Sequence, residues 1–288
     1  MAIIQNYLTK NPCFNTGIDI NVTGLFLHSV GCPQPSPLVF IKNWNKESYN
    51  SACVHGFIGE NDVHITLPCL ETPGRARRGW HAGKGTKGSA NDTHLGFEMC
   101  EPAYIKYTKG ATFTTSNYEA SVAYVQKTTR NAVELFAKLC KFHGLDPLED
   151  GVILSHAEGY KYGIASGHAD PDHLWRQLNM NYNMNTFRQD VNKELLRLVS
   201  EEEKNKMPNT SNTNGELSRF KQLFQEMRKE LQDDKASSWS EEARNWAKKE
   251  GLVQGSSNGE FNGMWEDFLT REQLVVMLYR FAKLIGKV

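Results

Sequence analysis

The chain has 288 residues and a formal net charge of zero, because its 33 basic side chains balance its 33 acidic ones. This balance gives no reason to expect binding to nucleic acid or to an anionic membrane surface. No apolar run approaches the roughly 18 residues of a membrane-spanning helix, so none is expected. The length suits one large domain together with a smaller one.

The N-terminus and the cysteines both indicate a protein made in the cytoplasm. The first residues, MAIIQNYLTKN, have neither a basic flank nor a long apolar segment, so we expect no signal peptide. The cysteines are scattered and form no CxxC pair: Cys13, Cys32, Cys53, Cys69, Cys100 and Cys140. We expect mostly reduced, buried thiols, with one or two disulfides as the alternative.

Hydrophobic patterns and turn residues predict the elements of the first half of the chain. They are a strand at residues 22–28, a proline-rich break at 29–37, a helix at 38–48, a hairpin at 52–58 and 63–67, a loop at 72–96 and a strand at 94–100. The first strand delivers His28 at its end. Alternation along the last strand places Glu98 on the face opposite to Phe97 and Met99.

The longest helix is predicted at residues 117–142, where apolar side chains recur at helical spacing. Thr115 or Ser116 can cap its start, and Gly144 ends it. Strands and helices interleave throughout this half of the chain. The sequence therefore predicts one α/β domain with a central sheet.

Composition changes after Val199. Residues 200–215 have almost no apolar side chains and predict a linker. Three helices are then expected, at residues 216–234, 240–250 and 270–285, the last with a capping box of Thr270 and Gln273. The predicted organisation is a domain at 1–199, a linker at 200–215 and a small all-α domain at 216–288, which is marginal alone.

A short buried strand at residues 152–154 leads into the stretch richest in candidate ligands, SHAEGYKYGIASGHADPDHLW at residues 155–175. It holds three histidines and two aspartates: His156, His168, His173, Asp170 and Asp172. Its glycines, from Gly159 to Gly167, favour a loop. Imidazole and carboxylate are the ligands of catalytic zinc sites, which use three protein ligands and keep one position for water. We expect two ligands from this stretch and the third from His28.

Each candidate also has a purely structural interpretation. A single histidine at a strand end is more often packed or exposed than a ligand. His55 and His64, in the predicted hairpin, are interpreted as structural. Glu98 is different, because an ionised carboxylate among apolar neighbours costs several kcal/mol unless it is paired or hydrated in a site. Trp80 and His81, flanked by glycines, form either a simple turn or a loop that touches substrate.

Four motifs in one order resemble a known family: LFLHSVG around His28, GWHAG around His81, LGFEMC around Glu98, and the stretch 155–175. Over residues 18–197 they resemble the zinc amidases that cleave N-acetylmuramoyl-L-alanine bonds. This is the amidase-2 or peptidoglycan-recognition-protein fold, in the form used by phage endolysins. The resemblance implies a central mixed β-sheet flanked by helices, with Zn²⁺ held in a groove.

The resemblance also implies a role for each motif residue. The implied zinc ligands are His28, His156 and Asp170. Glu98 falls on the catalytic acid/base. His168 stands where the family often carries a lysine that steadies the oxyanion, and whether His168 must be protonated for that stays open. Trp80 and His81 fall on a loop that lines the groove and binds substrate.

The tail has a resemblance of its own. Residues 246–255 and 269–280, with Phe261 between them, resemble one surface-layer-homology motif, a kind of module that binds secondary cell-wall polymers. Such motifs usually come in threes, so association of several tails would complete the site; the alternative is a small packing or self-association module. The Glu-rich run before Met207 is compatible with an internal translation start there, or with a solvated charged linker.

Together these features predict a peptidoglycan hydrolase of the phage-endolysin type, which separates stem peptides from the glycan of bacterial peptidoglycan. It would be made in the host cytoplasm and need a pore or lysis to reach the wall. No nucleic-acid or membrane partner is expected. The alternatives are a non-enzymatic peptidoglycan-binding protein on the same fold and a zinc hydrolase acting on another amide.

Overall fold

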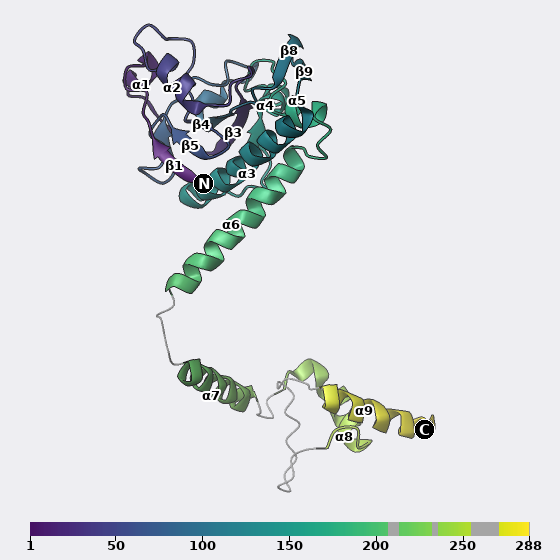
Figure 1. Cartoon of the computed structure of the whole chain (residues 1–288). Helices are drawn as coiled ribbons and strands as arrows, with labels where there is room; N and C mark the ends of the chain where they lie inside the picture. The colour runs from purple at the N-terminus through teal and green to yellow at the C-terminus, as the bar shows by residue number, and fades with distance from the viewer. Residues whose placement is uncertain (207–212, 232–235, 255–270, 288) are drawn as a thin grey trace. The chain divides into compact units, whose positions relative to one another are not determined.

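The computed structural model describes residues 1–206, 213–231, 236–254 and 271–287. The chain divides into two compact units, Met1–Lys206 and Met207–Val288 (Figure 1). Among the described helices, none combines the length and the apolar character that crossing a membrane requires.

The first unit contains ten strands and six α-helices. The strands are β1 (Ala2–Gln5), β2 (Asp19–Asn21), β3 (Gly24–Ser29), β4 (Gly56–Ile58), β5 (Asp62–Ile65), β6 (Arg75–Arg77), β7 (His94–Met99), β8 (Ile105–Lys109), β9 (Thr112–Thr115) and β10 (Ile153–Ser155). The helices are α1 (Pro12–Asn15), α2 (Pro37–Trp44), α3 (Tyr118–His143), α4 (His156–Tyr162), α5 (Asp172–Gln177) and α6 (Met184–Lys206). A single 3-10 turn at Ala90–Asp92 precedes β7.

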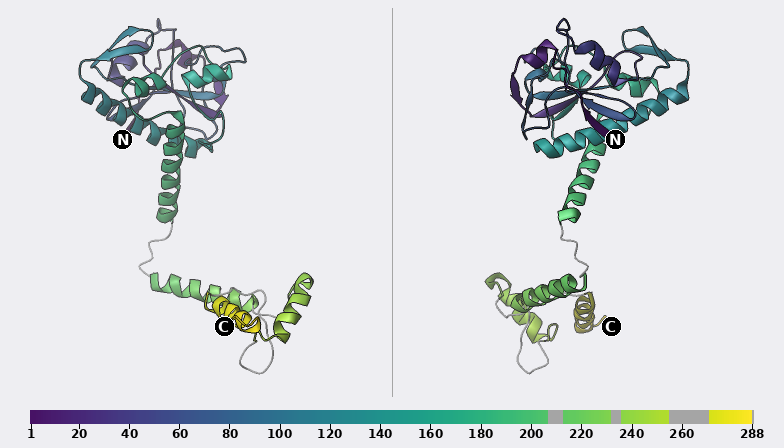
Figure 2. Two further views of the ribbon diagram at one scale, coloured as in Figure 1. Left: turned by 90° about the vertical axis from the view of Figure 1, so that its right-hand side faces the viewer. Right: turned by 60° about the vertical axis from the view of Figure 1, so that its left-hand side comes forward.

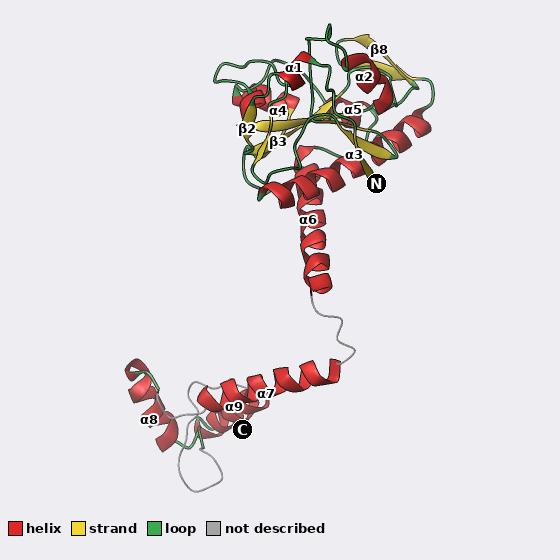
Figure 3. Ribbon diagram, turned by 90° about the vertical axis from the view of Figure 1, so that its left-hand side faces the viewer, coloured by secondary structure: helices red, strands yellow, loops and turns green. Residues whose placement is uncertain are grey.

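Six of the strands form one mixed sheet in the order β1-β5-β4-β7-β3-β10. The β4–β5 pair is antiparallel, as the predicted hairpin requires, and the other pairs are parallel. Helix α3 and the start of α6 cover one face of the sheet, and α1, α2 and α4 lie on the other (Figure 3). Every residue of β3 is buried, because an interior strand of a sheet covered on both faces meets no solvent. The predicted α/β class with a central mixed sheet is confirmed.

Helix α3 fills the space against the sheet with its apolar stripe, and Phe136 packs edge-to-face on Phe97 of β7. Its N-cap is Asn117, whose side chain accepts a hydrogen bond from the Ala120 N–H. The prediction of Thr115 or Ser116 as the cap was wrong. Gly144 ends the helix in the left-handed conformation, at φ 70°, as predicted.

No element was predicted from the sequence for the segment that forms helix α6. The helix runs to Lys206 and so includes the first residues of the segment interpreted as a linker. Ion pairs join Glu201 to Arg197 and Glu202 to Lys141. Glutamate and lysine are good helix formers, and charge pairs one turn apart support a helix without apolar side chains. Residues 207–212 of the predicted linker lie outside the described residues, and its last residues, 213–215, belong to a helix, α7 (Thr213–Leu231), instead of a linker. Both views of Figure 2 show the second half of α6 projecting from the sheet.

Two further local predictions were wrong. The helix predicted at residues 38–48 ends at Trp44, because Asn45 leaves the helical conformation. The glycine-rich segment after the strand 152–154 begins with helix α4 instead of a loop, capped by Ser155 and Glu158. Gly159 lies inside this helix because a Cβ there would be 2.0 Å from the ring of Phe26. Close packing, not loop conformation, requires that glycine.

The sequence did not predict five of the short strands. Strand β1 is an exposed edge strand, and β6 lies inside the predicted loop 72–96 and pairs with β2. Strands β8 and β9 form a separate hairpin. These strands have three to five residues, too few for alternation to be visible in the sequence.

The second unit is helical, as predicted. It contains α7 (Thr213–Leu231), a 3-10 turn (Ser238–Ser240), α8 (Glu241–Lys249) and α9 (Arg271–Leu284). The Arg280 guanidinium donates to the Leu252 carbonyl (3.1 Å) and to the side chain of Gln254 (2.9 Å), which ties α9 to the segment after α8. The predicted Thr270 cap, Phe261 and Met207 lie outside the described residues.

Candidate metal centre

Three parallel strands end at the same edge of the sheet and carry the site. The register pairs His28 of β3 with Glu98 of β7, so the two side chains lie on neighbouring strands and share a face. On the other side of β3, Leu27 pairs with Ser155, and His156 follows directly as the first residue of α4. The carboxyl ends of parallel strands are where open α/β sheets place their sites.

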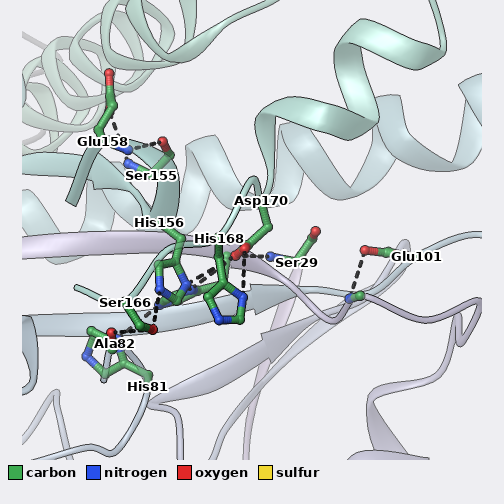
Figure 4. Close-up of polar contacts among 12 residues, drawn as sticks. Ser29, His81, Ala82, Glu101, Ser155, His156, Glu158, Ser166, His168 and Asp170 are labelled. Atoms are coloured by element: carbon green, nitrogen blue, oxygen red, sulfur yellow. Dashed lines mark hydrogen bonds and ion pairs between the residues drawn. The ribbon is translucent and has the colours of Figure 1, made fainter. Parts of the chain in front are cut away.

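The candidate ligands His28, His156 and Asp170 meet at this edge. Figure 4 shows His156 and Asp170 pointing toward one another. Nδ1 of His28 lies 3.0 Å from Nδ1 of His156 and 3.3 Å from Oδ2 of Asp170, and the remaining side of this triangle measures 3.6 Å. All three residues are buried, at 1%, 4% and 9% exposure. Asp170 reaches the group from the segment between α4 and α5.

The geometry of these three atoms fits a zinc ion. Zinc–nitrogen and zinc–oxygen bonds of 2.0–2.1 Å in a tetrahedral site separate the ligand atoms by about 3.4 Å. Two imidazole nitrogens and a carboxylate oxygen are all electron-pair donors, so their convergence calls for a cation or a shared proton. Burial raises the pKa of Asp170, but the neighbouring His156 and His28 side chains outweigh the effect of burial and hold that pKa well below its usual range. The carboxylate is therefore ionised and able to bind a metal.

Glu98 lies beside this group without joining it. It lines a cavity of about 760 Å³ together with His28, His156 and Asp170. Within the described part of the chain, its Oε2 has no hydrogen-bond partner. Burial, and after it the neighbouring Asp170 and Glu101, raises the pKa of Glu98 well above its usual value. A carboxylate that lines a cavity and has a raised pKa can hold or release a proton there.

His168 lies at the edge of the same cavity. Its ring stacks on the His156 ring at a centroid distance of 4.3 Å, and its Nδ1 is 3.8 Å from Oδ1 of Asp170. The side chain is 59% exposed, so it can contact a molecule bound in the cavity. The structure therefore brings His168 together with the three candidate ligands.

The two neighbouring residues of the GWHAG motif have different surroundings. His81 lines the cavity, and its Nδ1 lies 3.0 Å from Nε2 of His28. Trp80 instead packs against a separate apolar cluster that includes Leu8 and Leu67. Trp80 is not among the residues that line this cavity, and its predicted contact with substrate stays a prediction. Sequence position alone could not show that the two side chains lie in different environments, because Trp80 and His81 are adjacent in the chain.

Comparison with known proteins identifies the family. The sequence profile of the amidase-2 family, described as N-acetylmuramoyl-L-alanine amidase, matches residues 19–173, which is more than half of the chain. The chain belongs to this amidase family. No curated protein matches it in sequence.

Several solved structures match this chain at low sequence identity. The Staphylococcus aureus hydrolase AmiA, solved in complex with its ligand, is 19% identical with a TM-score of 0.51, over 69% of this chain and 86% of AmiA. The catalytic domain of XlyA is 19% identical with a TM-score of 0.45, over 66% of this chain and 99% of that one. A mutant endolysin from Bacillus subtilis is 18% identical with a TM-score of 0.44, over 66% and 99%. The likeness to AmiA supports the amidase fold.

This amidase also contains a polar network that the sequence analysis missed. Glu101 is fully buried and accepts hydrogen bonds from the Gly31 N–H (2.9 Å) and the Tyr107 hydroxyl (2.7 Å). The Tyr107 oxygen is also 2.6 Å from Nε2 of His173, which makes that nitrogen the donor when the phenol donates to Glu101. Burial raises the pKa of Glu101 to about 7. The network joins the loop after β3, the β8–β9 hairpin and α5, all of which contribute to the cavity wall.

One of these residues had a signal in the sequence. Glu101 lies two residues after the end of the buried strand β7, so the argument applied to Glu98 also applied to it. Tyr107 had none, because the short hairpin that carries it shows no clear pattern.

Proposed function

We propose that this protein is a zinc-dependent N-acetylmuramoyl-L-alanine amidase that cleaves the amide bond between N-acetylmuramic acid and the L-alanine of the stem peptide. One observation carries the proposal: three electron-pair donors lie 3.0–3.6 Å apart in the wall of a cavity that Glu98 also lines. Family membership supplies the substrate class.

His28, His156 and Asp170 would hold the zinc ion. When bound, zinc lowers the pKa of a water ligand towards about 7 and polarises a substrate carbonyl. The two neutral histidines and one carboxylate leave part of the zinc charge uncompensated, which suits an electrophilic site. The positive charge also favours the ionised form of Glu98 and opposes the effect of burial on its pKa.

Glu98 acts as the general base and then as the general acid. Its register position beside His28 places the carboxylate at the same edge of the sheet as the ligands. It accepts a proton from the attacking water and passes that proton to the alanine nitrogen as the amide bond breaks.

His168 stabilises the negative charge that develops on the carbonyl oxygen. It is the exposed member of the cluster, so its ring can move to a substrate while its neighbours stay fixed. A donor aimed at the developing oxyanion lowers the barrier more than one aimed at the ground state.

The wider role that fits these features is that of a phage-type endolysin. The protein would be made in the host cytoplasm and reach the wall through a partner pore or after lysis. The second unit would serve as its wall-binding module, as the resemblance to a surface-layer-homology motif implies. Helices α8 and α9 line an apolar groove of about 400 Å³, which gives this unit a surface for a wall polymer or for association with another copy.

Mass spectrometry of digested cell walls tests the enzymatic proposal. Purified peptidoglycan treated with the zinc-loaded protein should release stem peptides with new free amino groups on alanine and no new reducing sugars. A sample treated with a chelator serves as the control. New reducing ends would indicate a glycosidase, and binding without any cleavage would indicate a recognition protein.

Sedimentation with purified walls tests the role of the second unit. The full chain should pellet with walls that keep their secondary polymers and less with walls from which acid has removed them. Equal pelleting in both cases, together with concentration-dependent dimers, would indicate self-association instead.

A further inference from the structure

The side chain of His81 connects a backbone carbonyl to a candidate zinc ligand. Its Nε2 is 3.1 Å from the carbonyl oxygen of His94, and its Nδ1 is 3.0 Å from Nε2 of His28. The sequence predicted that His81 touches substrate. The structure shows both of its ring nitrogens engaged with the protein.

Hydrogen-bond roles along this chain of contacts determine which nitrogen of His28 is free. A carbonyl oxygen can only accept, so the proton of a neutral His81 sits on its Nε2 and leaves Nδ1 as an acceptor. His28 must then donate from Nε2, and its Nδ1 keeps its electron pair. That Nδ1 is the atom that faces His156 and Asp170.

The backbone around His81 is fixed in place. The side-chain oxygen of Asn91 accepts from the N–H groups of His81 and Ala82, at 2.8 and 2.9 Å. The ring occupies the space above Gly96, where a Cβ would lie 2.3 Å from its Cγ. The position of the His81 ring is therefore set by β7 and by the turn before it.

Ala82, the residue after His81, positions His156 through Ser166 (Figure 4). The Ser166 hydroxyl donates to the Ala82 carbonyl (3.3 Å), and its oxygen lies 3.4 Å from Nε2 of His156. A hydroxyl that donates to a carbonyl offers its lone pairs to the remaining neighbour, so His156 donates from Nε2. Nδ1 of His156 then keeps its electron pair as well.

We propose that residues 81–82 are a positioning element for both candidate ligand histidines. They hold the proton of each imidazole on Nε2, so that each Nδ1 can donate its electron pair to a metal. His28 is held directly and His156 through Ser166. This inference rests on the proposed zinc function and adds the residues that hold the ligands. Partners that orient ligand imidazoles in this way affect metal affinity without touching the metal.

Zinc affinity in a matched pair of variants provides the test. His81→Asn keeps an acceptor near the place of Nδ1, whereas His81→Leu has a similar volume and none. The zinc dissociation constant, measured by competition with a chromophoric chelator, should rise about 10- to 100-fold in His81→Leu and stay within about threefold of wild type in His81→Asn. Ser166→Ala should have a smaller effect than His81→Leu, because its contacts are longer. Equal affinity of wild type and His81→Leu would overturn the proposal.

Long-range ¹⁵N–¹H spectra of the zinc-loaded wild-type chain give a second readout that requires no variant. Both His28 and His156 should carry their proton on Nε2 and bind through Nδ1. Ligation through Nε2 of either residue would overturn the proposal even if His81→Leu failed to fold. A wild-type chain that binds no zinc would instead refute the proposed function, so the two failures are distinguishable.

Discussion

The two units bury their apolar residues to very different degrees. In the first unit, strands β3 and β7 and helix α3 share one large core of fully buried side chains. Among the described residues of the second unit, Leu252 is the one buried apolar side chain. On α9, Leu278 and Phe281 are 57% and 42% exposed. Both units have apolar residues at helical spacing, but the described residues show a closed core in the first unit alone.

This difference explains why the candidate centre belongs to the first unit. His28 is separated by 128 residues from His156 and by 142 residues from Asp170, yet their ligand atoms lie within 3.6 Å. Such accuracy needs side chains locked by a close-packed interior. An open apolar groove, like that between α8 and α9, suits binding to a surface that supplies the missing contacts.

The largest expected effect comes from loss of a metal ligand in the first unit. His28→Ala, His156→Ala or Asp170→Ala should abolish zinc binding and activity, because the site has only three protein ligands. Asp172→Ala should be mild, since Asp172 is not part of the cluster. Zinc analysis by plasma emission checks this. A zinc-loaded Asp170→Ala protein and an empty Asp172→Ala protein would reverse the assignment.

Glu98→Gln should lower turnover by about 10²-fold or more, the usual contribution of a positioned proton transfer. Zinc content and folding should survive, because the amide keeps the shape of the carboxylate. Turnover and melting temperature are measured on one preparation. A zinc-loaded Glu98→Gln protein with wild-type turnover would rule out the catalytic role.

One substitution placed in both units compares their cores directly. Leu139 on α3 is fully buried, so Leu139→Ala should lower the free energy of unfolding by about 2–5 kcal/mol. Leu278 on α9 is 57% exposed, so Leu278→Ala should change the free energy of unfolding by about 0.5 kcal/mol or less. Denaturant unfolding measures both. Equal losses would show that α9 belongs to a core as closed as that of the first unit.

The histidines of the first unit make its stability depend on pH. Burial lowers the pKa of His55 from 6.5 to about 4, and its Nε2 donates to the Arg77 carbonyl while its Nδ1 accepts from Gly96. Between these pH values the unfolded chain binds more protons, so stability falls as pH drops from about 6.5 to 4, by up to about 3 kcal/mol. In His55→Gln this loss should be reduced. The free energy of unfolding of the metal-free wild type and of metal-free His55→Gln, measured across this pH range, checks this prediction. Parallel curves of that free energy against pH would contradict it.

Removal of the second unit should have the smallest effect on the first. The chain should be cut after Lys206, because α6 packs on α3 through Val191 and Leu195 and continues beyond Val199. The melting temperature of the truncated protein and its hydrolysis of soluble muropeptides should stay near those of the full chain. Lysis of intact cells should fall more. Equal loss on both substrates would mean that the second unit supports the fold instead of targeting.

The sequence by itself determined the elements whose cause is local. Alternation in β7 predicted that Glu98 faces away from Phe97 and Met99, and the apolar stripe of α3 predicted a helix that ends at Gly144. The motif residues His28, His156, His168 and Asp170 were predicted to meet, and the structure brings them together. Periodicity and motifs are properties of a short stretch of chain, so one sequence is enough to show them.

Tertiary structure alone decided which residues each side chain would contact. Trp80 and His81 are adjacent, yet one packs in an apolar cluster and the other holds the ring of His28. Tyr107 joined the cavity wall through a hairpin too short to show a pattern, and Gly159 stands in a helix because Phe26 lies against it. A sequence pattern fixes the direction of a side chain relative to its own element. The contact at the end of that side chain depends on residues that folding brings from elsewhere in the chain.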